Sequence, residues 1–156
     1  MAIALTLQRY LARQRVDYDV VPHAPTLSSM HTAEASHVPG DCLAKAVVLK
    51  HDTGYLLAVI PASHRLGLEE LAALLQRRTK LATEEEIERL FGDCTRGAIP
   101  PIGAAYGMDL IVDDSITEQP EIYFEGGDHG TLVHMTGDRF AQLTAGAQHG
   151  RFSHHG

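Results

Sequence analysis

Lys45 is the residue whose type and position most clearly suggest chemistry, because it begins the apolar run Ala46 to Leu49. In a strand, Lys45, Val47 and Leu49 lie on one face. A lysine on a buried face is costly unless its charge has a partner. If that face borders a cavity, an anionic or carbonyl-bearing ligand could be the partner. Equally, this could be a strand-end lysine whose stem is buried and whose ammonium group reaches water. Spacing alone leaves both interpretations open.

A second candidate is the loop Gly97-Ala98-Ile99-Pro100-Pro101-Ile102-Gly103. The two prolines fix φ and stiffen the loop, and the flanking glycines permit close approach and unusual backbone angles. Such a loop can hold backbone N–H groups ready to bind a carbonyl or to stabilise an oxyanion. A purely structural turn explains the pattern about as well.

A third candidate is the turn Gly126-Gly127-Asp128-His129-Gly130 between two expected strands. Its glycines would let a ligand approach the backbone, and Asp128 or His129 could assist proton transfer. An ordinary tight turn is the simpler interpretation.

Local motifs for other chemistries are missing. The sequence has no G-x-S-x-G elbow, no P-loop, no H-E-x-x-H and no G-x-G-x-x-G. Its ten histidines are scattered, so surface or hydrogen-bonded histidines are favoured over a zinc hydrolase. Cys94 is better explained as a small buried residue than as a nucleophile. Ser63-His64 is read as a loop end rather than as a catalytic pair.

The elements that must position these residues follow from periodicity. Strands are expected at 44–50 and 55–60, joined by a turn at 52–54, and their apolar character on both faces places them centrally in a sheet. Further strands are expected at 18–21, 110–112, 122–124 and 132–135, and helices at 3–15, from 32, from 68, from 84 and at 138–143. Thr83 and Glu86 form the pattern of a capping box. The Gly/His-rich residues 146–156 are expected to be frayed. The interspersed order favours a mixed α/β domain of the α+β type.

The amino-acid composition and net charge exclude several classes of protein. The 156 residues are 44% hydrophobic and carry a net charge of −7, which fits one globular domain rather than a disordered chain. The acidic balance argues against a non-specific nucleic-acid coat, although a local RNA contact needs only a small patch. Two cysteines do not make a disulfide framework, and no stretch has the length of a membrane span. A soluble, reduced, cytoplasmic protein is expected.

Taken together, these features resemble the YbaK/EbsC family of aminoacyl-tRNA deacylases, which includes the editing insertion domain of bacterial prolyl-tRNA synthetases. The similarity runs over about residues 3–145, with 146–156 as a flexible tail. Lys45 precedes the hairpin that ends Ala58-Val59-Ile60-Pro61, and Gly97, Pro101 and Gly103 match the loop pattern G-x-x-x-P-x-G.

The resemblance implies a mixed sheet or barrel-like core with surrounding helices. It implies hydrolysis, in trans, of the ester between a wrong amino acid and the 3′ end of tRNA. Lys45 would place the 3′ end and the loop from Gly97 would position the carbonyl. No metal or other cofactor is expected, and a ribose hydroxyl of the substrate would help to activate water.

Further site residues and partners complete the prediction. Tyr18, Met30 and His129 are candidates for the wall of the amino-acid pocket, and Pro101, Gly103 and Gly127 for substrate binding. The partners expected are the acceptor end of a mischarged tRNA and a synthetase or elongation factor that delivers it, with neither DNA nor membrane. The alternative is a non-catalytic module of the same fold that binds an aminoacyl group, tRNA or a synthetase.

Overall fold

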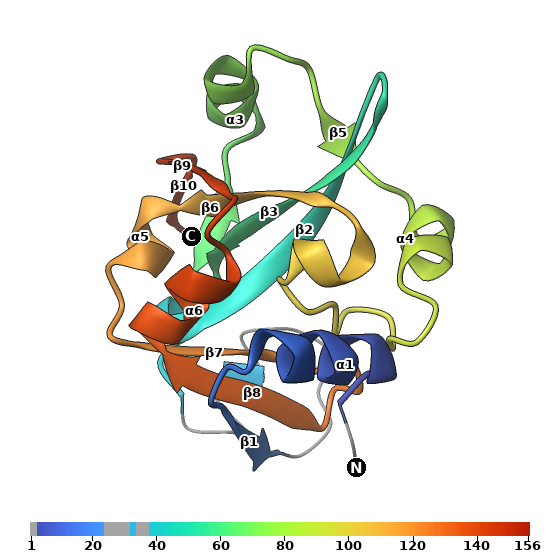
Figure 1. Cartoon of the computed structure of the whole chain (residues 1–156). Helices are drawn as coiled ribbons and strands as arrows, with labels where there is room; N and C mark the ends of the chain where they lie inside the picture. Colours follow the sequence, from blue (N-terminus) through green and yellow to red (C-terminus); the bar gives the residue numbers. More distant parts are fainter. Residues whose placement is uncertain (1–2, 24–31, 34–37) are drawn as a thin grey trace.

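A long hairpin forms the centre of the protein. In the computed structural model, which describes residues 3–23, 32–33 and 38–156, β2 (Leu43–His51) and β3 (Gly54–Pro61) pair antiparallel from Ala44↔Pro61 to His51↔Gly54. Parallel neighbours flank the hairpin, with β7 (Glu121–Glu125) beside β2 and β6 (Asp109–Asp113) beside β3 (Figure 1). The prediction that these two apolar strands are central is therefore confirmed.

The remaining strands extend this sheet in both directions. The order is β1-β8-β7-β2-β3-β6-β9, where β1 is Asp19–Pro22, β8 is Thr131–Thr136 and β9 is Gln148–Gly150. The short β5 (Lys80–Leu81) pairs with β2. Because the order contains both parallel and antiparallel pairs, the sheet is mixed, and the α+β prediction is confirmed.

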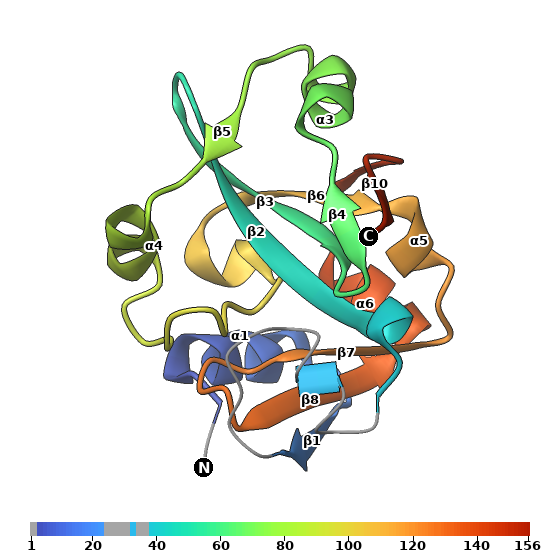
Figure 2. The same cartoon turned by 180° about the vertical axis from the view of Figure 1, so that it is seen from behind.

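Two helices build the main core on one face of the sheet. α1 (Leu5–Gln14) buries Leu7 and Leu11, and α6 (Gly137–Leu143) buries Phe140 against Phe124 of β7. Both helices lie in front of the sheet in Figure 1 and behind it in Figure 2. The opposite face of β2 is therefore left for other elements.

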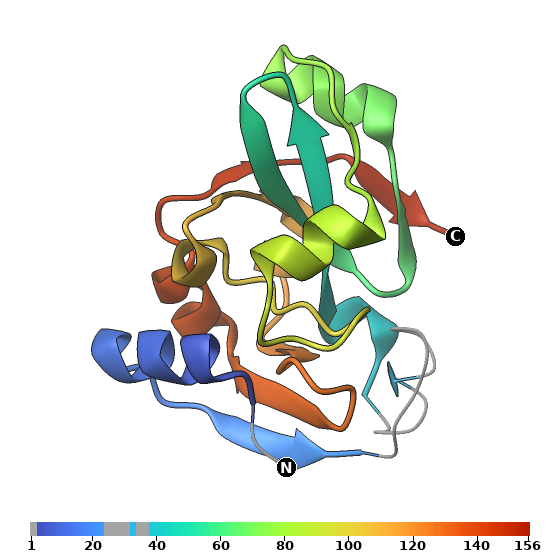
Figure 3. The ribbon, with the colours of Figure 1, turned by 90° about the vertical axis from the view of Figure 1, so that its right-hand side faces the viewer.

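The other helices are short and lie around the hairpin. These are α3 (Leu68–Leu75), α4 (Glu84–Leu90) and α5 (Asp114–Thr117), with the 3-10 turns η1 (Gly40–Cys42) and η2 (Gly103–Tyr106). The predicted capping box is present, since Thr83 Oγ1 accepts the N–H of Glu86 and the Glu86 carboxylate accepts the N–H of Thr83. The side view in Figure 3 shows α4 beside the β2–β3 hairpin.

The C-terminal segment differs from the sequence prediction. Instead of a frayed tail, Gln148–Gly150 pairs with β6, and β10 (Ser153–His155) pairs with β4 (His64–Leu66). Phe152 between them is fully buried. A glycine- and histidine-rich sequence has weak local preference, and the burial of one phenylalanine supplies the ordering energy that composition does not reveal.

In the described part of the chain, no helix is long and apolar enough to cross a membrane.

Candidate functional site

A cavity of about 590 Å³ is lined by residues of β2, β4, β5 and α4. Figure 2 shows β4 on one side of β2 and β5 and α4 on the other. Lys45 of β2 and Gly97, which are far apart in the sequence, both line it. The other lining residues are Leu43, Ala44, Ala46, Val47, Val48, Ile60, His64, Arg65, Leu66, Leu81, Ala82, Glu84, Ile87, Ile99 and Glu125. The wall is thus mainly apolar with a few charged groups, as is typical of small-molecule sites.

Lys45 is half-buried at the start of the central strand. The parallel pairing Leu43↔Tyr123 and Ala44↔Phe124 brings the next residues of the two strands, Lys45 and Glu125, to the same end of the sheet. Lys45 forms no ion pair within the described residues. A half-buried cation at a cavity wall is available to an anionic or carbonyl-bearing ligand.

The loop at Gly97 is shaped for close approach. Gly97 has φ +82°, and a Cβ at this position would lie 3.0 Å from His129 Nε2. A side chain would therefore strain the backbone and press on the histidine ring. The N–H of Ala98 donates to the Thr95 carbonyl at 3.0 Å, whereas those of Gly97 and Ile99 have no partner within the described residues.

The turn at 126–130 forms hydrogen bonds with the segment that leads into this loop. The Thr95 N–H donates to the Gly127 carbonyl at 2.6 Å, and His129 Nε2 hydrogen-bonds to the Arg96 carbonyl. Gly127 has φ +117° and lies against α1, where a Cβ would be 2.9 Å from Ala4 Cβ. His129 itself has a positive φ of 60°, which is uncommon for a side-chain-bearing residue. The turn thus positions the loop, and Gly127 does not itself line the cavity.

Glu125 is a cavity residue that sequence reasoning missed. Its carboxylate is buried and accepts a hydrogen bond from Thr32 Oγ1 at 3.0 Å. His23 Nε2 lies 3.3 Å from one carboxylate oxygen and His129 Nδ1 lies 3.4 Å from the other. The only sequence signal is a charged residue that ends a β-strand before Gly126, a position usually taken as exposed.

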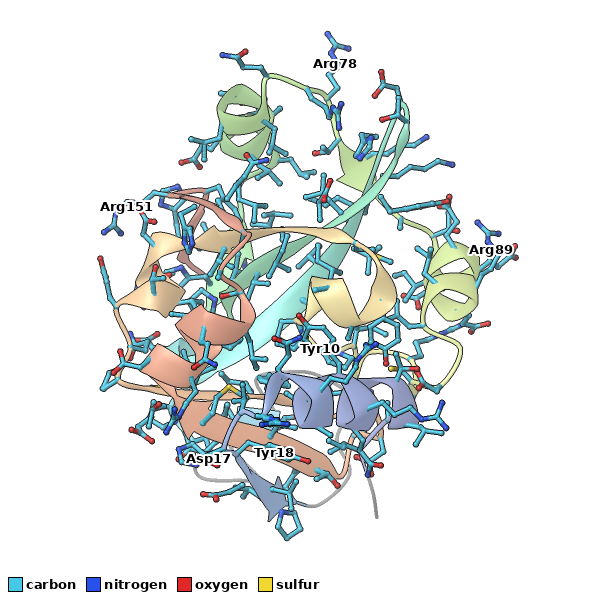
Figure 4. All side chains as sticks on the ribbon, in the orientation of Figure 1. Tyr10, Asp17, Tyr18, Arg78, Arg89 and Arg151 are labelled. Atoms are coloured by element: carbon cyan, nitrogen blue, oxygen red, sulfur yellow. The ribbon has the colours of Figure 1, made fainter. Side chains whose placement is uncertain are left out.

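Other predicted substrate-binding residues lie outside the cavity lining. Pro101 and Gly103 are buried, and a Cβ at Gly103 would meet the Met108 carbonyl oxygen at 2.6 Å. These two residues thus shape the turn that leads to η2. Tyr18 precedes β1 at the far edge of the sheet and is 37% exposed (Figure 4). Met30 lies outside the described residues.

The structure does not support Cys94 or Ser63 as a nucleophile. Burial raises the pKa of Cys94 to about 11, and the nearby Asp93 adds to this effect, so the thiol stays protonated at neutral pH. Its sulfur lies 3.3 Å from the Tyr106 hydroxyl and does not line the cavity. Ser63 donates to Asp41 rather than to its neighbour His64, which lies against Ser153.

Metal-binding geometry is found elsewhere. Within the described residues, the cluster of side chains that could hold an ion is Asp41, His64 and His155. Of these, His64 alone reaches the cavity wall.

Comparison with known proteins bears on the family and the fold. The family model of the aminoacyl-tRNA editing domain matches residues 23–143. A structure described as a proposed trans-editing enzyme for prolyl-tRNA synthetase superposes with a TM-score of 0.81 at 24% identity, covering 96% of this chain and 95% of that chain. A hypothetical protein, APE2540, gives a TM-score of 0.84 at 21% identity, with 96% and 99% covered.

A protein from Marinobacter aquaeolei VT8 with a proposed role in signal transduction gives a TM-score of 0.76 at 22% identity, covering 96% of this chain but 30% of its own. No curated protein sequence matches the chain significantly. The structural likenesses bear on the fold, whereas the family model covers most of the sequence and includes Lys45, Gly97 and Glu125. The chain therefore belongs to the aminoacyl-tRNA editing domain family.

Proposed function

We propose that the protein hydrolyses the ester bond of mischarged aminoacyl-tRNA in the cavity between Lys45 and the loop at Gly97. The observation that carries the proposal is that these two family-matching features, 52 residues apart by their numbers, line one cavity with no ion pair on Lys45 in the described part of the chain. A cavity of about 590 Å³ is within the usual range for a nucleotide-sized ligand.

In the proposed complex, the Lys45 ammonium binds the phosphate or ribose oxygens of the terminal nucleotide. The N–H groups of Gly97 and Ile99, which have no partner in the described part of the chain, face the ester carbonyl and stabilise the oxyanion. Water adds to the carbonyl carbon, the bond from that carbon to the ribose oxygen breaks, and free amino acid and tRNA leave. A ribose hydroxyl of the substrate helps to activate this water, and no metal takes part.

His129 and Glu125 position the loop at Gly97. His129 Nε2 donates a hydrogen bond to the Arg96 carbonyl, which holds the ring against Gly97. Its Nδ1 lies 3.4 Å from a Glu125 oxygen but forms no hydrogen bond within the described residues. His129 thus sets the position of the Gly97 backbone, and Glu125 sets the position of His129. Because charged tRNA is used in translation, the reaction belongs to the cytoplasm, with a synthetase or elongation factor as the source of substrate.

A direct test is deacylation of alanyl-, cysteinyl- and seryl-tRNA, including mischarged tRNA for proline, by the purified protein. We expect release of at least one amino acid, and loss of that activity in Lys45→Ala. Arg9→Ala is the matched control, because Arg9 is an exposed cation on α1 away from the cavity.

Two results would count against the proposal. If none of the charged tRNAs is hydrolysed but they are bound, the protein is a binding module of the same fold. If an activity exists and Lys45→Ala retains it in full, the reaction takes place at another site.

A further inference from the structure

Three side chains from distant segments meet near the C-terminus. They are Asp41 of η1, His64 of β4 and His155 of β10, and their candidate ligand atoms all lie within 4.8 Å of one another. The antiparallel pairing of β4 with β10 places His155 opposite His64, with ring centroids 4.3 Å apart. His155 Nε2 lies 3.1 Å from Asp41 Oδ1. Figure 2 shows the two strands side by side at the chain end.

Neighbouring hydroxyls orient two of these groups. Ser153 Oγ lies 2.8 Å from His64 Nδ1, and Ser63 Oγ donates to Asp41 Oδ1. Metal-binding histidines usually have such a partner on the nitrogen that does not bind the ion, and metal-binding carboxylates are similarly hydrogen-bonded. His64 would thus bind through Nε2.

The donor set selects the kind of ion. Two imidazoles and one carboxylate suit Zn²⁺ and similar first-row ions, whereas Mg²⁺ and Ca²⁺ prefer oxygen ligands. Three protein ligands leave a position for water, and a surface cavity of about 360 Å³ lined by these residues gives solvent access. Asp41 is 51% exposed and His155 is 70% exposed, so an ion could enter without unfolding.

We propose that Asp41, His64 and His155 bind one Zn²⁺ ion in the cavity of about 360 Å³ that shares His64 with the editing cavity. The ion would link the C-terminal strand β10 to β4 and to η1. Without it, β10 pairs with β4 over three residues and contacts η1 through His155 and Asp41. Of the three ligands His64 alone also lines the editing cavity, and the proposed ester hydrolysis assigns no step to this ion.

The test is zinc binding by the full chain without an affinity tag, after removal of metal with a chelator. Titration with ZnCl₂ in a calorimeter should give one ion per chain, and Co²⁺ should give the visible absorption of a low-coordinate site. Asp41→Ala and His155→Ala should each weaken zinc binding by at least about tenfold. Circular dichroism checks that both variants fold.

His154→Ala is the matched control. His154 is the adjacent histidine, but its Nε2 lies 2.7 Å from Glu70 rather than in the cluster. Its loss should leave zinc affinity unchanged. The absence of saturable zinc binding would overturn the proposal, and so would equal weakening in His154→Ala or unchanged binding in Asp41→Ala and His155→Ala. None of these results depends on deacylase activity.

Discussion

Glu125 connects two parts of the site at the scale of single residues. Its carboxylate contacts Thr32 and His23 on one side and His129 on the other. A buried carboxylate requires such partners, because an unpaired charge in an apolar environment is very costly. The same carboxylate lies 3.4 Å from Nδ1 of His129, the histidine that lies against Gly97.

Replacing this carboxylate by an amide tests its positioning role. Glu125→Gln keeps the shape but removes the charge, and hydrogen bonds to charged groups contribute about 1.5–3 kcal/mol. We therefore expect kcat/KM for deacylation to fall by about tenfold to about 100-fold. Glu118→Gln, which removes an exposed carboxylate that pairs with Arg151, should leave kcat/KM unchanged. A folded Glu125→Gln protein with full activity would show that His129 needs no such support.

His134 predicts a pH dependence of stability. Burial opposes its charge, but contacts of its ring with Glu121 at 2.5 Å and Asp19 at 3.1 Å prevail and raise its pKa above the ordinary value. The folded state then favours the protonated ring, so the stabilisation is complete below about pH 6.5 and is lost as pH rises through the raised pKa.

The variant His134→Gln isolates this effect. We expect its loss of unfolding free energy to be larger at about pH 5.5 than at about pH 8.5, with a difference within about 1 kcal/mol because Asp19 is exposed. Urea unfolding at both pH values measures it. An equal loss at the two values would contradict the assignment.

At the scale of elements, the segment before Gly97 is held at three successive points. The Asp93 carboxylate accepts a hydrogen bond from the N–H of Thr6 at the start of α1. The N–H of Thr95 donates to the Gly127 carbonyl, and the backbone carbonyl of Arg96 accepts from His129 Nε2. The loop therefore has little conformational freedom left to lose when a ligand binds, which suits a preorganised oxyanion site. The glycine-rich turn at 126–130 contributes to the site chiefly as a support.

The C-terminal segment gives a stability prediction at the same scale. Phe152 is fully buried with Leu71 and Ile111, and its N–H donates to Asp113 at 2.8 Å. Phe152→Ala should lower the free energy of unfolding by about 3–5 kcal/mol, because it leaves a cavity. The neighbouring variant Arg151→Ala removes a surface ion pair and should cost less than about 1 kcal/mol. Similar losses in the two variants, measured by urea unfolding, would argue that the segment is not anchored by its phenylalanine.

Elements with a long periodic pattern were predictable, and the shortest ones were not. The hairpin, α1 and the Thr83 capping box follow from patterns within single segments. By contrast, β4, β5, β9 and β10 have two or three residues each, too few to show a period. Such strands form because a neighbouring strand supplies hydrogen-bond partners.

At the scale of the whole molecule, acidic groups outnumber basic ones, 20 to 13. Several of the basic side chains are already paired, including Lys50 with Glu86 and Arg96 with Glu84 and Glu88. Arg78 and Lys80 lie on the exposed end near β5, where Figure 4 shows Arg78 pointing outward. Contact with tRNA should therefore be local and involve few phosphates.

This charge balance predicts weak, salt-dependent tRNA binding. If about two or three phosphates are contacted, affinity should fall by about tenfold or somewhat more between ~50 mM and ~200 mM salt. Binding of a tRNA that carries an amide-linked amino acid, measured by fluorescence anisotropy, tests this without hydrolysis. Nanomolar affinity that persists at the higher salt would show a larger RNA interface than the charge distribution indicates.

The sequence by itself predicted the mixed fold and the central hairpin, and it singled out Lys45 and the loop at Gly97 as candidate site residues. These follow from local pattern and from the resemblance to an editing family, which the family match confirms. Only the tertiary structure decided that the Glu125 carboxylate contacts Thr32 and His23, that Tyr18 lies away from the cavity, and that His155 meets Asp41 and His64. Contacts between residues about 100 positions apart are set by strand pairing and burial, and local sequence patterns carry no record of them.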